Sequence, residues 1–120
     1  MRNPVVLSAA LACAIASLPS RAAAPDETYR PTFATCAAYF FLSARGSAAT
    51  RYDHLYSAGE FALNQAVREQ GRPAAEARMG SDSTLMMDEI DQDWRLVERL
   101  EKKYGGSCDA LLRDAHFEAP

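Results

Sequence analysis

Residues that favour β-strands are scarce in this chain once the first twenty positions are passed. Valine and isoleucine are few there, and no run alternates between apolar and polar residues as a half-buried strand would. Alanine, leucine, arginine and glutamate dominate instead, and these residues favour helix. The sequence therefore predicts an all-α protein.

A surplus of basic residues is also missing. The whole chain carries a formal net charge of −3, and no stretch of lysine and arginine stands out. A nucleic-acid partner would require a basic face, and an anionic membrane surface would attract a basic cluster. We expect neither partner.

The longest apolar run is too short to cross a membrane. It extends over 14 residues, from Val5 to Leu18, whereas a transmembrane helix needs about 20. Arg2 precedes the run, Pro19 breaks it, and small residues follow at 22–24, which is the layout of a cleavable signal peptide. We expect cleavage after Ala24 or after Ala22, no membrane anchor afterwards, and a periplasmic or secreted protein.

The remaining chain has the length of one domain. Residues 25–30 are polar without periodicity and are interpreted as a flexible leader, and residues 31–120 as a single helical domain. A lipid-attachment site at Cys13 is the weaker interpretation, because the apolar run continues past that cysteine where a lipoprotein would become polar. Cleavage removes two arginines and leaves 11 basic residues against 16 acidic ones.

Cysteine is rare, and the mature chain keeps only Cys36 and Cys108. Two cysteines in an oxidising compartment favour one intramolecular disulfide. Two free buried thiols, or a bridge to a second chain, are the alternatives. No Cys-x-x-Cys motif supports a redox role, and no Cys-x-x-Cys-His motif supports a c-type haem.

Helical periodicity divides the domain into three main helices and a short fourth one. The predicted ranges are 31–45, 48–70, 73–104 and 108–115. With short connections between them, successive helices should be antiparallel neighbours in a small up-and-down bundle, closed by the disulfide.

Glycine and serine supply the predicted helix ends. Gly46 is expected as a left-handed C-terminal cap and Gly71 as the end of the second helix. Ser47 is expected as an N-terminal cap, and 105–106 as the end of the third helix. Gly59 lies inside an apolar stripe and predicts a close helix crossing. The segment 80–84 is the weakest part of the third helix, which is expected to continue through it with a kink or else to restart there.

A catalytic constellation is not visible. Asp53 and His54 are neighbours, but adjacent residues on a helix point about 100° apart and do not form a hydrogen-bonded dyad. Methionines at 79, 86 and 87 could join His54 around a soft metal, but two of them lie on the apolar stripe, where methionine is an ordinary filler. The acidic residues at 88–93 do not match a calcium loop. No enzyme, metal or cofactor is predicted.

Aromatic and acidic side chains are the remaining candidates for function. Aromatic residues are numerous for so small a domain, which favours either an exposed patch or a crowded core with tyrosine hydroxyls at its edge. The acidic run could attract a basic partner or could simply be a solvated helix face. The residues proposed for an interaction surface are Tyr39, Tyr52, Tyr56, Asp88 and Asp91.

These observations favour an exported helical protein that binds another protein, as an inhibitor, immunity factor, adaptor or chaperone would. The alternative is a periplasmic carrier of a small apolar ligand between the helices. A third hypothesis is an enzyme or metal-binding protein that uses His54. A homodimer is compatible with each of them.

Overall fold

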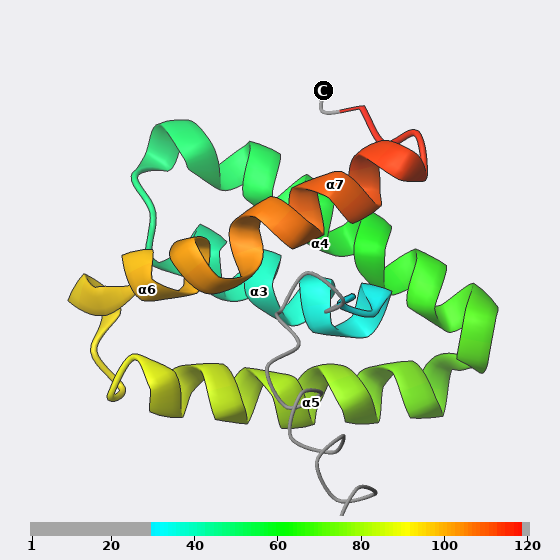
Figure 1. Cartoon of the computed structure of the whole chain (residues 1–120), viewed down its shortest axis with the longest axis horizontal. Coiled ribbons are helices and arrows are strands. Elements are labelled where there is room, and N and C mark those ends of the chain that lie inside the picture. The colour runs from blue at the N-terminus through cyan, green and yellow to red at the C-terminus, as the bar shows by residue number, and fades with distance from the viewer. Residues whose placement is uncertain (1–29, 119–120) are drawn as a thin grey trace, which may run out of the picture.

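The computed structural model describes residues 30–118, and every regular element in that range is helical (Figure 1). Helix α3 (Phe33–Arg45) is the central element, and α4 (Ala49–Gln70) and α5 (Arg72–Glu89) pack on it and on each other. Successive helices run in opposite directions (Figure 1). The all-α class and the bundle are confirmed.

The fourth helix is longer than predicted and covers the near side of the bundle in Figure 1. It begins with α6 (Glu98–Leu100), continues through a π-helical turn, η4 (Glu101–Gly105), and ends with α7 (Gly106–Asp114). These three pieces follow one another without interruption, and together they are called the C-terminal helix. A short 3-10 turn, η3 (Trp94–Leu96), precedes it.

The predicted signal peptide at 1–24, the leader as far as residue 29, and the last two residues of the chain lie outside the described residues. Within the described part of the chain, no helix combines the length and the apolar character that spanning a membrane requires.

The start of α3 is set by a threonine cap. Thr32 has an extended backbone, and its hydroxyl oxygen accepts a hydrogen bond of 3.1 Å from the backbone N–H of Thr35. The helix therefore begins at Phe33 and not at Pro31. At the other end the backbone N–H of Gly46 donates to the carbonyl of Leu42, but its φ of −91° is not left-handed, so the predicted left-handed cap is wrong.

The boundaries of α4 are close to those predicted, although one cap differs. The Ser47 hydroxyl donates to the carbonyl of Ser43 at 2.6 Å and caps the end of α3, so α4 begins without a side-chain cap. Gly71 ends α4 as predicted. Its φ of +88° suits glycine, and its N–H donates to the carbonyl of Val67.

Gly59 marks the predicted close crossing. A Cβ atom at this position would lie 2.8 Å from Cδ1 of Phe41, which is closer than atoms of this kind approach one another. The absence of a side chain lets α4 lie directly against the Phe41 ring of α3. The glycine therefore costs helix propensity but allows this close contact between the two helices.

The predicted single helix over 73–104 is wrong, because the chain turns after α5. Helix α5 passes straight through 80–84, and it ends before Asp91 and Gln92, whose φ values of 54° and 57° are left-handed. Tertiary contact explains the continuity at 80–84. Asp82 is buried there and accepts a hydrogen bond of 2.7 Å from the Thr35 hydroxyl of α3, which outweighs the weak helix propensity of the segment.

The predicted break at 105–106 is also wrong, and close packing explains why glycine is found there. Both glycines have right-handed helical angles. A Cβ atom on Gly105 would lie 3.1 Å from the hydroxyl oxygen of Tyr39. Gly105 therefore makes room for the buried tyrosine of α3 and does not end the helix.

The π-helical turn keeps one face of the C-terminal helix against α3. The buried residues of the C-terminal helix are spaced four apart. In a regular α-helix, residues with this spacing shift around the helix axis by about 40° at each step. The wider turn over 101–105 offsets this drift, because its hydrogen bonds join residues five apart. The residues that stay buried on this face are Leu100, Tyr104, Cys108 and Leu112.

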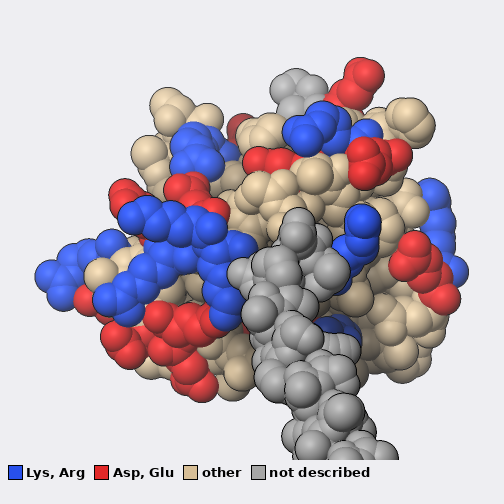
Figure 2. All heavy atoms as spheres, in the orientation of Figure 1, with Lys and Arg blue, Asp and Glu red and all other residues tan. Residues whose placement is uncertain are grey.

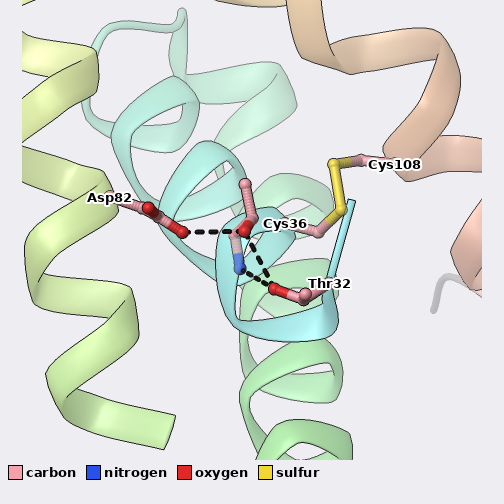
Figure 3. Close-up of a disulfide and its surroundings, with 5 residues drawn as sticks. Thr32, Cys36, Asp82 and Cys108 are labelled. Atoms are coloured by element: carbon pink, nitrogen blue, oxygen red, sulfur yellow. Dashed lines mark hydrogen bonds between the residues drawn. A yellow bond between two sulfur atoms is a disulfide. The ribbon is translucent and has the colours of Figure 1, made fainter. Parts of the chain in front are cut away.

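The predicted disulfide is confirmed. Cys36 and Cys108 join α3 to α7, with their Cα atoms 5.4 Å apart and a sequence separation of 72 (Figure 3). Neither cysteine is exposed to solvent. A buried bridge of this kind indicates folding in an oxidising compartment outside the cytoplasm.

Removing the bridge should lower the stability strongly. Because the disulfide closes a long loop, the double variant Cys36→Ala, Cys108→Ala should lose about 4 kcal/mol of unfolding free energy, or about 20 °C in melting temperature. Thermal unfolding followed by circular dichroism measures this. An equal melting temperature for the variant and the oxidised protein would contradict the stabilising role.

Two glycine substitutions should have opposite effects on stability. Gly59→Ala should destabilise the fold by about 1–3 kcal/mol, because its Cβ atom overlaps the Phe41 ring. Gly80→Ala is the matched control on α5, where an added Cβ atom would meet no side chain and no other helix within 4 Å, and it should stabilise the fold by about 1 kcal/mol. Urea unfolding of both variants measures the difference. Changes of the same sign would contradict the close crossing.

Candidate functional site

The most exposed aromatic side chains form a row across α3 and α4. The rings of Tyr52 and Tyr56 are stacked, with their centroids 5.6 Å apart and an interplanar angle of 17°. The Phe41 ring meets Tyr56 edge-on at 5.2 Å. Two of these three residues come from the first turns of α4, and Phe41 is half-buried beneath them.

The row continues along α3 to the turn that follows α5. Arg45 lies one helical turn after Phe41 and therefore on the same face of α3. Its guanidinium carbon lies 5.9 Å from the centroid of the Trp94 ring, within the range of a cation–π contact. We call the set Phe41, Arg45, Tyr52, Tyr56 and Trp94 the aromatic strip.

Solvent reaches the strip over much of its length. The exposed fractions are 42% for Tyr52, 41% for Tyr56 and 38% for Trp94. Next to Trp94 is a shallow pocket of about 370 Å³ between α3 and the end of α5, with Leu42, Met87 and Gln92 in its lining. Asp88 is close to this pocket, since its carboxylate accepts a hydrogen bond from the Gln92 amide at 3.1 Å.

Tyr39 does not belong to this surface. It is only 3% exposed and packs between Phe40 and Tyr104 in the core. The sequence could not separate it from Tyr52, because both lie next to apolar helical positions. The difference arises because α4, α5 and the C-terminal helix all pack against α3, whereas the first turn of α4 is exposed to solvent.

The acidic run at the end of α5 is compensated by nearby donors. Asp91 lies 3.3 Å from Arg99, Glu89 pairs with Lys103, and Asp93 pairs with Arg95. The hydrogen bonds from Arg95 hold the pKa of the exposed Asp93 carboxyl below its usual value. Figure 2 shows one group of basic side chains gathered over α6, with acidic ones above and below it. The acidic surface predicted around Asp88 and Asp91 is therefore part of a mixed-charge region, in which Asp91 pairs with Arg99.

A larger groove of about 570 Å³ lies between α5 and the C-terminal helix. Its apolar part consists of Leu85, which is 59% exposed, with Met86 and the ring of Tyr104. Its polar side chains come from three helices and are Thr35, Arg78, Asp82, Lys103 and Ser107. We call this the α5 groove.

A chain of hydrogen bonds leads from the start of α3 to the mouth of the α5 groove (Figure 3). The hydroxyls of Thr32 and Thr35 lie 2.8 Å apart, and Thr35 donates to Oδ2 of Asp82. The same carboxylate oxygen accepts from Nε of Arg78 at 3.0 Å. Asp82, which is 9% exposed, thus holds a half-exposed arginine in position.

Sequence reasoning missed this group. The four-residue spacing of Arg78 and Asp82 was a usable signal for an ion pair on one helix face. Asp82, however, lies in a segment of glycine, serine and threonine that resembles a weak point of the helix. Its burial becomes visible only when α3 is placed against α5.

His54 is exposed near a small hollow of about 230 Å³ between α4 and α7, together with Asp109, Arg113 and Phe117. Within residues 30–118, no hydrogen bond of the His54 side chain is found, and no group of three or more His, Cys, Asp or Glu side chains is arranged to hold a metal ion. Of the methionines considered with it, Met86 is part of the core, and Met79 and Met87 pack against that core.

Two tyrosines have strongly altered ionisation. Burial raises the pKa of Tyr39 to about 12. Burial, and after it the hydrogen bond of 2.7 Å to Glu89, raise the pKa of Tyr104 to about 12. The same glutamate raises the pKa of Lys103, so the ammonium group at the edge of the α5 groove keeps its charge at neutral pH.

Comparison with protein-family models, with curated proteins and with solved structures gives no match for this chain. The functional argument therefore depends on the geometry of these surfaces.

The raised tyrosine pKa values predict a loss of stability in alkali. Because both groups stay protonated in the folded protein and ionise near pH 10 when unfolded, their contribution is complete below pH 10 and is lost as the pH rises through about 12. Urea unfolding between these pH values, with phenolate absorbance recorded in parallel, measures it. Tyr39→Phe should show a smaller alkaline decrease than the native chain. An equal decrease in both proteins would contradict the buried phenol.

Proposed function

We propose that this chain is an exported helical binding protein and that it engages a protein partner through the aromatic strip. The observation that carries the proposal is the set of three large aromatic side chains that stay exposed beside an arginine. Tyrosine, tryptophan and arginine are the residue types that dominate the binding energy of protein interfaces. The rigid rings of tyrosine and tryptophan bury a large area on binding and lose little conformational freedom.

The strip also suggests the chemistry of the partner. None of the ion pairs within residues 30–118 involves Arg45, although its guanidinium is held over Trp94. A carboxylate on the partner could pair with Arg45 while an apolar side chain fills the pocket next to Trp94. The expected partner surface therefore carries an acidic residue beside an apolar one.

Export is the second part of the proposal. The buried disulfide supports it, because such a bridge persists outside the reducing cytoplasm. The apolar run that ends before Pro19 supplies the targeting signal in this proposal. An inhibitor, an immunity factor, an adaptor and a chaperone would each fit a small stapled domain of this kind.

The other hypotheses have less support from the geometry. A carrier of a purely apolar ligand would favour an apolar cavity, whereas the α5 groove has charged walls. An enzyme using His54 would need a nucleophile and an orienting group beside it. The hollow near His54 offers Asp109 but neither a serine nor a cysteine within the described lining.

The test is capture of a partner by the oxidised protein from periplasmic extract, followed by binding measurements with the purified pair. Trp94→Ala and Tyr56→Ala should each weaken binding by about 2 kcal/mol or more, because each removes a large exposed aromatic side chain of the strip. Leu85→Ala is the matched control, since it removes an exposed apolar side chain outside the strip and should leave the affinity unchanged.

The outcome is decided by the variants and not by capture alone. Binding that survives both strip substitutions, or that Leu85→Ala weakens equally, would contradict the aromatic strip as the interface. Sedimentation of the purified chain distinguishes a second copy of this chain from a different partner. Self-association that Trp94→Ala abolishes would show that the aromatic strip binds a second copy of this chain, and would contradict a different protein as its partner.

A further inference from the structure

We infer that the α5 groove binds a small organic anion with an apolar body. This site is separate from the aromatic strip, because the two use different sides of α5. Asp82, Leu85 and Met86 line the groove, whereas Ser83, Thr84 and Met87 line the pocket beside Trp94. The result of the binding test at one site therefore does not determine the result at the other.

The size of the groove suits a small molecule. Its volume of about 570 Å³ lies within the range of sites that bind drug-sized ligands, about 300–1,000 Å³. The exposed side chain of Leu85 and the surfaces of Met86 and Tyr104 offer apolar contact along it. An apolar ligand body would cover Leu85, the most exposed of the large hydrophobic side chains within residues 30–118.

The hydrogen-bond donors of the groove favour an anion. Arg78 projects from α5 and Lys103 from the C-terminal helix, so cationic groups stand on both walls. Asp82 is the single carboxylate among the described lining residues, and two donors already occupy its Oδ2. Glu89 lies just outside the lining and pairs with Lys103, so the four charges at the groove balance. The Thr35 hydroxyl already donates to Asp82, so the donors open to an anion are the terminal nitrogens of Arg78 and the hydroxyl of Ser107.

Arg78 is positioned for this role. Only its Nε takes part in a hydrogen bond within residues 30–118, which leaves both terminal nitrogens for a ligand. Asp82 holds the guanidinium from behind and is itself fixed by Thr35 on α3 (Figure 3). A planar guanidinium held in this way presents two parallel donors to a carboxylate or sulfonate. Arg78 is thus assigned as the anion-binding residue and Asp82 as its positioning residue.

The experiment uses two probes that share an apolar body and differ in charge. Anilinonaphthalene sulfonate carries the anion, and its uncharged parent, phenylnaphthylamine, lacks it. Fluorescence titration of the oxidised protein should show saturable binding of the sulfonate that is about tenfold or more tighter than binding of the parent. Raising the ionic strength should weaken binding of the sulfonate and leave binding of the uncharged parent unchanged.

Single substitutions locate the binding site. Arg78→Gln and Lys103→Gln should each weaken sulfonate binding, with Arg78→Gln reducing it by about tenfold. Arg68→Gln is the matched control, because Arg68 is an exposed arginine on α4 outside the groove, and it should bind as the native chain does. Melting temperatures of all variants show that each one is folded.

Asp82→Asn separates positioning from charge alone. This substitution makes the groove more positive, so charge alone predicts tighter binding, whereas loss of the hold on Arg78 predicts weaker binding. The positioning role requires a weaker complex with a folded variant. The inference is overturned by equal affinity for the two probes, by unchanged binding in Arg78→Gln, or by the absence of saturable binding of the sulfonate.

Discussion

Burial of α3 is the constraint on which the rest of the structure depends. Ten of its thirteen residues are buried, and they include polar as well as apolar side chains. A helix with this composition can be stable only when other helices cover most of its surface. Helices α4, α5 and the C-terminal helix do so, and the disulfide fixes the last of them to α3. Small residues along α3, most of them alanines, let these neighbours approach closely.

The unusual local features follow from this covering. Tyr39 brings a hydroxyl into the interior, and Gly105 leaves the space for it. The π-helical turn keeps the buried side of the C-terminal helix directed at α3 for its full length. Thr35 brings a second polar group, and Asp82 reaches across from α5 to satisfy it. This buried hydrogen bond thus ties α3 to α5 inside the small core.

The two surfaces considered for binding arise where that covering is incomplete. The aromatic strip lies over the part of α3 that carries Phe41 and Arg45, the two least buried positions near its end. The α5 groove lies where α5 and the C-terminal helix stand apart, above Thr35. One surface offers flat aromatic rings suited to a protein, and the other offers a concave, charged lining suited to a small molecule. Both depend on side chains held by the same central helix.

The sequence by itself determined the helical class, the first two main helices, the bridge between Cys36 and Cys108, and the close crossing at Gly59. These features follow from composition, periodicity and a small number of cysteines, which are properties of local segments or of simple pairing. Only the tertiary structure decided that α5 ends before Asp91, that the chain stays helical through Gly105, and that Tyr39 is inside while Tyr52 and Tyr56 are outside. The physical reason is that each of these outcomes depends on a neighbour far away in the sequence. A glycine looks the same whether it ends a helix or makes room for a tyrosine, and an aspartate looks exposed until a threonine from another helix is placed beside it.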